Sequence, residues 1–135
     1  RIELAMTLRT LGVESVPLNF LNPQPGTPFA GIQPMPPMEI LQNIAAFRFM
    51  LPRCEIRIAG GRAFLGDMQS MIFMAGASGV MIGDYLTTKG RQVEDDLRMI
   101  DSLRLQIRGD TQQRREARKT KASGAAPHVL QRLTK

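Results

Sequence analysis

The feature that most constrains the fold is an alternation of apolar patterns with helical spacing and short extended apolar segments. Glu3–Leu11 has helical spacing and stops at Gly12, and Val13–Phe20 is typical of a strand. This pair of patterns recurs twice. The further expected helices are Met38–Leu51, Asp67–Ala77 and Gln92–Leu103, and the further expected strands are Cys54–Ala59 and Gly79–Gly83. Helices and strands in alternation favour parallel strands with covering helices.

The expected fold class is therefore α/β, either an open doubly wound sheet or part of a (β/α) barrel of the TIM type. Three strands are too few to close a barrel. Arg1 already lies within a helical pattern, with neither an initiator Met nor a cap, which is typical of a piece cut from a longer chain. Such a piece is expected to expose apolar surface and strand edges, and to aggregate without the rest.

The net charge of +6 comes entirely from the C-terminal end. Residues 1–107 carry ten basic and ten acidic side chains, whereas residues 108–135 carry eight and two. The segment Thr111–Ala126 has almost no large apolar residue, which predicts a disordered basic tail. We divide the chain into a folded part, 1–107, and this tail, 108–135. A nucleic-acid contact of the tail is the less favoured alternative.

Several classes of protein are disfavoured by composition. No apolar run approaches the roughly 20 residues of a membrane span, and no basic leader followed by an apolar segment is present. We expect a cytoplasmic protein without a membrane partner. The single cysteine, Cys54, allows neither an internal disulfide nor an all-cysteine metal site.

A long irregular loop follows the first strand. Leu21–Pro37 holds six prolines and two glycines, which exclude regular structure. Asn19 lies where the strand meets this loop, and strand ends on that side are where barrel enzymes place substrate groups. An asparagine that only caps loop amides is an equally good interpretation.

Arg57 is the second candidate residue. On a strand, Ile56 and Ile58 face one way, toward the helices, and Arg57 faces the other side with Glu55 and Ala59. A buried guanidinium must be paired or coordinated. From the residues alone, an ion pair is the favoured interpretation.

Several stretches, in this order, resemble the late barrel strands of biotin synthases and the domain shared by biotin and thiamine synthesis enzymes. They are LGVESVPLNFLNP at 11–23, PGTP at 25–28, EIRIAGGR at 55–62, MAGA at 74–77, and Gly83 with YLTT at 85–88. The resemblance covers Arg1 to about Leu103. It implies a radical S-adenosylmethionine (SAM) enzyme, and it implies the C-terminal part of a TIM-type barrel.

The resemblance also implies roles. The family inserts sulfur into dethiobiotin to form biotin with SAM, a [4Fe-4S] cluster and a [2Fe-2S] cluster, and usually forms homodimers. Asn19 then matches a residue of the dethiobiotin pocket, Phe20, Leu21 and Asn22 match residues near SAM, and Arg57 matches an arginine ligand of the [2Fe-2S] cluster. The family's CxxxCxxC segment is not in this sequence, so the chain alone is expected to be inactive.

Alternatives stay open. A related radical SAM enzyme of thiamine synthesis or hydrogenase maturation would share the fold, and a truncated, inactive product with a nucleic-acid-binding tail is the alternative outside enzymes. Asp84 departs from the small or uncharged residue expected between Gly83 and Tyr85. We interpret Gly60-Gly61 as a tight turn, and the methionines at 68, 71, 74 and 81 as core residues. His128 is expected to be solvated.

Overall fold

The chain forms two compact units, Arg1–Val80 and Met81–Lys135. This architecture comes from a computed structural model, which describes residues 1–85, 89–108 and 132–134.

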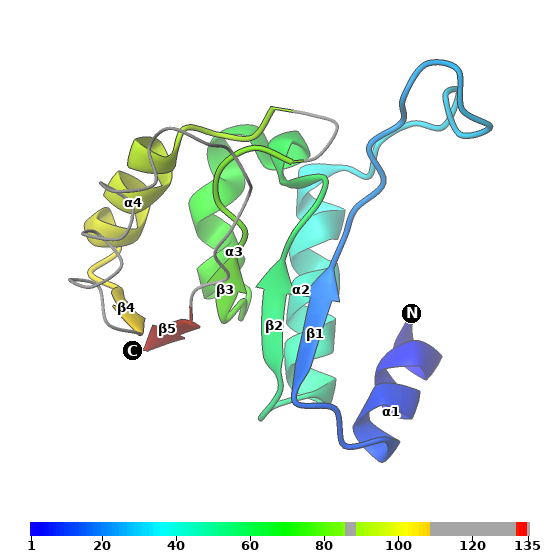
Figure 1. Cartoon of the computed structure of the whole chain (residues 1–135). Coiled ribbons are helices and arrows are strands. Elements are labelled where there is room, and N and C mark those ends of the chain that lie inside the picture. Colours follow the sequence, from blue (N-terminus) through cyan, green and yellow to red (C-terminus); the bar gives the residue numbers. More distant parts are fainter. Residues whose placement is uncertain (86–88, 109–131, 135) are drawn as a thin grey trace. The chain divides into compact units, whose positions relative to one another are not determined.

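The first unit alternates helices with parallel strands, as the sequence predicts (Figure 1). Its strands hydrogen-bond in the order β1-β2-β3, and both pairs are parallel. Closure into a TIM-type barrel stays a prediction. In chain order the elements are α1 (Ile2–Thr10), β1 (Ser15–Leu18), α2 (Pro37–Met50), β2 (Glu55–Ile58), the 3₁₀ segment η1 (Arg62–Ser70), α3 (Met71–Met74) and β3 (Gly79–Val80).

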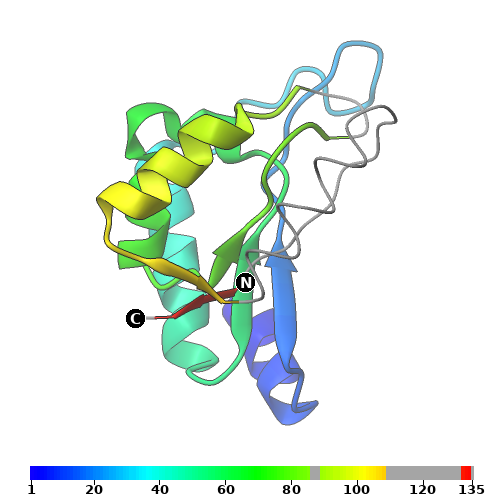
Figure 2. The same ribbon diagram turned by 60° about the vertical axis from the view of Figure 1, so that its left-hand side comes forward.

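The sheet has a buried face and a more open one. Ile56 and Ile58 of β2 are fully buried, and they pair in register with Val16 and Leu18 of β1. Glu55 and Arg57, which alternate with them along β2, are only partly buried. Helices α2 and α3 lie behind the strands in Figure 1 and on one side of them in Figure 2. The predicted strand period is therefore confirmed, with Arg57 on the face away from these helices.

Two helix boundaries follow directly from local chemistry. Gly12 follows α1 with a φ of 66°, the left-handed conformation that ends helices and that glycine adopts at little cost. Helix α2 begins at Pro37, whose fixed φ suits the first turn of a helix, where no backbone N–H partner is needed. The predicted helices over these two segments are confirmed within one residue.

The predicted single helix Asp67–Ala77 is wrong in form. The segment consists of the end of η1, a tighter 3₁₀ coil, and the single turn α3. Gly66 has a non-helical backbone, with φ 50° and ψ −127°, and Gly76 stops the helix at φ 109°. The backbone therefore leaves the helical conformation at both glycines, and the 3₁₀ geometry of η1 leaves only a single α-helical turn before Gly76.

Arg48, near the end of α2, joins three segments of the first unit. Its guanidinium donates to the backbone oxygens of Gly76 at 2.8 Å and Cys54 at 2.8 Å, and to the Ser78 hydroxyl at 2.6 Å. It also donates to the carbonyls of Leu51 and Pro52, just after the helix. These bonds satisfy backbone groups that a helix end and two turns leave without partners.

The second unit contains helix α4 (Val93–Ser102) and a strand pair. The predicted helix Gln92–Leu103 is confirmed, with Ile100 buried on its apolar side. Strands β4 (Gln106–Arg108) and β5 (Arg132–Thr134) pair antiparallel. The expectation of a tail without structure is thus wrong at Arg108 and Arg132–Thr134, because these residues belong to strands that pair through their backbones. The rest of the predicted tail, His128 included, lies outside the described residues.

A buried acid in α4 was not predicted. Asp96 is fully buried, and its carboxylate lies 3.8 Å from the guanidinium of Arg91. It belongs to the acidic first turn of α4, where carboxylates interact favourably with the helix dipole.

No helix in the described parts of the chain combines the length and apolarity that crossing a bilayer demands.

Candidate functional site

Asn19 lies directly after β1, at the carboxyl end of the sheet. Its side-chain oxygen, Oδ1, accepts a hydrogen bond of 2.8 Å from the backbone N–H of Gly60. Gly60 is the second residue after β2, so this bond connects the ends of two neighbouring strands. Asn19 thus does cap a loop amide, and its side chain is also exposed at the position where a ligand can reach it.

The backbone around Asn19 is held on both sides. The N–H of Ala59 donates to Leu18 at 2.9 Å, and the N–H of Phe20 donates to Gly60 at 2.9 Å. Gly61 has a φ of 79°, and a Cβ on it would come within 2.1 Å of the Phe20 carbonyl oxygen. The predicted tight turn at Gly60-Gly61 is confirmed, and only a glycine at 61 permits this approach.

Arg57 occupies the third position of β2. It pairs in register with Pro17 on one side and with Gly79 on the other. Its Nε is buried and has no hydrogen-bond partner among the described residues. A buried donor is thus left unpaired among these residues, and the ion pair that the sequence favours stays a prediction.

Asn19 and Arg57 lie on the same face of the sheet. Alternation along β1 places Asn19 with Pro17, which is in register with Arg57. One strand spacing combined with two residues along a strand separates their Cα atoms by roughly 8 Å. Two long polar side chains at that separation can contact one small molecule between them.

The three residues after Asn19 differ in exposure. Phe20 is buried, with 8% of its surface accessible, whereas Leu21 and Asn22 are exposed at the start of the proline-rich loop. In Figure 1 this loop extends beyond the carboxyl ends of β1 and β2. Leu21 and Asn22 are thus accessible from solvent, whereas Phe20 belongs to the core.

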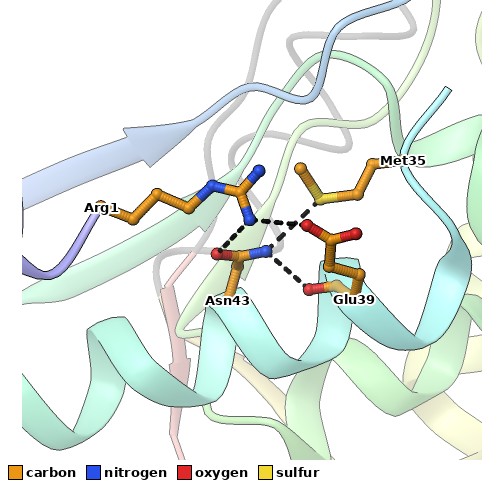
Figure 3. Close-up of polar contacts among 4 residues, drawn as sticks. All are labelled: Arg1, Met35, Glu39 and Asn43. Atoms are coloured by element: carbon orange, nitrogen blue, oxygen red, sulfur yellow. Dashed lines mark hydrogen bonds and ion pairs between the residues drawn. The ribbon is translucent and has the colours of Figure 1, made fainter. Parts of the chain in front are cut away.

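A pocket of about 560 Å³ lies elsewhere, between α1 and α2. At its rim, Nη1 of Arg1 donates to Oε1 of Glu39 at 2.7 Å and to Oδ1 of Asn43 at 3.2 Å (Figure 3). The Asn43 amide donates to the Glu39 carbonyl and to the sulfur of Met35. These polar groups satisfy one another, and the residues lining the pocket belong to the two helices except Arg1, which directly precedes α1. The pocket is therefore separate from the sheet face of Arg57.

Other metal-ligating side chains are scarce. No group of three or more His, Cys, Asp or Glu side chains comes together within residues 1–85, 89–108 and 132–134. Cys54 is buried and lies before β2, at the opposite end of the strand from the Gly60-Gly61 turn. Burial raises the pKa of its thiol.

Residues 17–106 match the family model of the Biotin and Thiamin Synthesis associated domain. The chain belongs to this family. The matched range begins in β1 and ends in β4, so it includes Asn19, the Gly60-Gly61 turn and Arg57. Family membership was predicted from these same stretches and is confirmed.

Within this family the similar proteins are biotin synthases. The chain is 58% identical over 101 residues to the biotin synthase of Syntrophotalea carbinolica, which is 74% of this chain and 31% of that protein. It is 56% identical over 110 residues to that of Geobacter metallireducens, 81% of this chain and 33% of that protein. The chain thus spans about a third of the length of the relatives it matches. The resemblance to the C-terminal half of a biotin synthase is confirmed.

Some residues of this Biotin and Thiamin Synthesis associated domain were not found from sequence. Gly60 was interpreted only as part of a turn, although its N–H holds Asn19. Asp84, which departs from the expected pattern, accepts a hydrogen bond of 3.0 Å from the N–H of Gly90 and so closes a loop. An arginine in the last turn of a helix, as Arg48 is, could have been predicted to bond the carbonyls that follow.

Proposed function

We propose that this chain contributes the dethiobiotin- and sulfur-facing sheet of a biotin synthase, which converts dethiobiotin to biotin by radical SAM chemistry. Identity of 58% to a biotin synthase over 101 residues carries the proposal. The complete reaction needs a CxxxCxxC segment for the [4Fe-4S] cluster, which this sequence lacks. The chain alone is then inactive.

Arg57 is the proposed ligand of the [2Fe-2S] cluster. Its guanidinium fits such a role because the Nε atom is buried and has no partner within the described residues, although burying a charged group costs several kcal/mol unless it is compensated. When bound, this cluster would supply the sulfur atom. The role of this chain is to hold the guanidinium in place. The buried side chains of Ile56 and Ile58 anchor the strand on the opposite face.

Asn19 is the proposed contact to dethiobiotin. Its carboxamide is exposed at the strand end and lies on the same sheet face as Arg57. Phe20, Leu21 and Asn22 are the proposed SAM-side segment. The exposure of Leu21 and Asn22 supports this assignment. The Phe20 side chain is buried, so Phe20 would contribute through its backbone.

The proposal extends to the surroundings of the enzyme. We place it in the cytoplasm, as a homodimer when complete, with residues 1–107 as the working part and 108–135 as a basic extension. The names of the relatives favour biotin over thiamine synthesis, although the family model includes both.

A hybrid enzyme tests the proposal. In the biotin synthase of Syntrophotalea carbinolica, the 101 residues that match this chain are replaced by the corresponding residues of this chain. Biotin formation from dethiobiotin is then measured with purified, cluster-reconstituted protein. We expect activity within tenfold of the parent. Arg57→Ala should abolish activity and alter the visible absorption and Mössbauer spectra of the [2Fe-2S] cluster, while the [4Fe-4S] signals remain.

Two results would count against it. A folded hybrid that forms no biotin, although both clusters are present, would refute the biotin synthase assignment. An Arg57→Ala hybrid with unchanged [2Fe-2S] spectra would refute the ligand role alone. Arg53→Ala is the matched control, because Arg53 is exposed in the turn before β2 and no role is assigned to it.

A further inference from the structure

The end of the proline-rich loop is attached to α2 through a sulfur atom. Nδ2 of Asn43 lies 3.4 Å from the sulfur of Met35, which precedes the two prolines at the start of the helix (Figure 3). Within the described residues, the other hydrogen bonds of segment 21–35 form turns between residues 24 and 32. Among those residues, the bond to Met35 is the one that joins the segment to another element.

The carboxamide of Asn43 is oriented by its other partner on the same side. Its Nδ2 amide donates to the backbone carbonyl of Glu39 at 2.7 Å, and a carbonyl oxygen only accepts, so the NH₂ end must lie there. The NH₂ group has two hydrogens, and the second is donated to the sulfur of Met35. A donor is therefore held in place against a thioether, which is a weak acceptor.

We propose that Met35 is a site of reversible oxidation, and that its sulfoxide binds the Asn43 amide and fastens the loop to α2. Oxidation adds one oxygen to the sulfur and makes the side chain polar. A sulfoxide oxygen accepts a hydrogen bond more strongly than a thioether sulfur, and a donor already faces it here. Met35 is only partly buried, and its unbranched side chain can withdraw slightly to admit the oxygen.

The oxidant is a peroxide, with hydrogen peroxide as the simplest case. A lone pair of the sulfur attacks one peroxide oxygen, and an S–O bond forms as the O–O bond breaks. The hydroxide that leaves takes the proton of the transferred oxygen and becomes water. The sulfur loses two electrons and the peroxide gains them. Methionine sulfoxide reductases restore the thioether with two electrons from thiols, which become a disulfide.

The exposed methionines differ from Met35 in their surroundings. Met38 is 53% exposed, and Met74, which was expected in the core, is 68% exposed. Neither has a hydrogen bond to its sulfur among the described residues. Both should react with peroxide, but their sulfoxides meet only water. Oxidation at Met35 therefore strengthens a contact within the folded chain, whereas oxidation of a core methionine disrupts packing.

A double-mutant cycle in the 135-residue chain tests the bond. Met35→Gln supplies an amide oxygen in place of the sulfoxide oxygen, and Met35→Leu supplies no acceptor. Urea denaturation gives the ratio of the folding equilibrium constants of these two variants. The ratio should be about threefold to tenfold larger with Asn43 present than in an Asn43→Ala background, which is the size of one net hydrogen bond. The corresponding ratio for Met38→Gln and Met38→Leu is the matched control, and Asn43→Ala should change it by less than about twofold.

Peroxide treatment tests the modification itself. The folded chain is treated with hydrogen peroxide, and the sulfoxide at each methionine is measured by mass spectrometry of its peptides. Met35 should be oxidised, and a methionine sulfoxide reductase with dithiothreitol should restore it. We expect restoration to be at least about threefold slower than in an Asn43→Ala chain, because the enzyme must first break the bond to Asn43. Restoration of Met38 should proceed at the same rate in both chains.

Three results would overturn the proposal. A Gln-to-Leu ratio at position 35 that Asn43→Ala leaves unchanged would show that an oxygen there does not bind the Asn43 amide. Equal rates of restoration of Met35 in the two chains would show the same for the sulfoxide. A Met35 that stays reduced while Met38 and Met74 are oxidised would show that it is not a modification site. Biotin formation is not measured in these experiments, so the biotin synthase assignment stands or falls separately.

Discussion

Cys54, the single thiol of the chain, is only 6% exposed, just before β2. Loss of hydration on burial raises the pKa of this thiol, and the nearby charge of Arg48 opposes the shift. The proton is therefore held to higher pH in the folded protein than in the unfolded chain. The contribution of Cys54 to stability is constant below the ordinary thiol pKa of about 8.5 and falls as pH rises above it.

Alkylation measures this directly. In the native chain at pH 8, iodoacetamide should modify Cys54 at least about a hundredfold more slowly than in denaturant, because the thiol is both enclosed and protonated. The rate should begin to rise only at a pH above that of the denatured chain. Equal rates in both states would show that the thiol is accessible. A Cys54→Ser chain controls for modification of other groups.

For single residues, the sequence predicts which face of a strand a side chain lies on better than it predicts which residues that side chain contacts. The period of β2 correctly placed Ile56 and Ile58 in the core and Arg57 on the opposite face. It could not predict that Arg57 Nε lacks a partner in the described part of the chain, because that depends on which residues distant in sequence come close. The bond from Gly60 to Asn19 joins residues 41 positions apart and was missed for the same reason.

Among the elements, α2 depends on Arg48 to hold its end against β2 and the turn before β3. Replacing Arg48 by Ala removes bonds to five acceptors and leaves partly buried carbonyls without donors. We expect the free energy of unfolding to fall by about 2–4 kcal/mol, since hydrogen bonds to charged groups contribute about 1.5–3 kcal/mol each and are not additive.

Urea denaturation followed by circular dichroism gives this value. Arg53→Ala removes an exposed guanidinium close by and should change stability by less than about 0.5 kcal/mol. A loss below 1 kcal/mol for Arg48→Ala would show that water replaces its bonds.

The ends of β1 and β2 depend on Gly61. Gly61 and Gly26 have almost the same φ, 79° and 78°, but only Gly61 lies against another segment. Alanine at position 26 should cost about 1–2 kcal/mol of stability from backbone strain alone. At position 61 the Cβ also meets the Phe20 carbonyl, and we expect about 1–3 kcal/mol more. Thermal unfolding measures both losses. Equal losses of stability for Gly26→Ala and Gly61→Ala would show that the contact between position 61 and the Phe20 carbonyl adds nothing to the cost.

The elements themselves were largely predictable. Helices α1, α2 and α4 and all three parallel strands follow from apolar spacing with glycine and proline boundaries. The helix predicted at Asp67–Ala77 failed because apolar spacing records which side chains are buried but not which helical hydrogen bonds form. Residues 62–70 keep a buried Leu65 while adopting 3₁₀ geometry.

At the scale of the whole molecule, apolar side chains remain on the surface of α1. Leu4 is 56% exposed and Leu11, just after the helix, is 70% exposed. In the described sheet, β1 pairs with β2 alone, so it presents an unpaired edge. Exposed apolar groups and an open strand edge both favour association.

We expect the 135-residue chain to self-associate at micromolar concentration, as measured by sedimentation velocity. Leu4→Lys combined with Leu11→Lys should shift the distribution toward monomer. The control is Ile32→Lys, which changes a 46% exposed residue in the proline-rich loop and should have little effect. A wild-type chain that stays monomeric at 100 times that concentration would contradict the prediction.

The proline-rich loop has a thermodynamic consequence for any ligand that it covers. Six of the residues from Leu21 to Pro37 are prolines, whose rings lock φ and also restrict the residue before each. The loop therefore has few backbone conformations to lose, where an ordinary residue loses about 1–2 kcal/mol of conformational entropy on ordering. Closure of this segment on a ligand therefore costs less conformational entropy than closure of an equally long loop without prolines, so a larger share of its contact energy remains in the affinity.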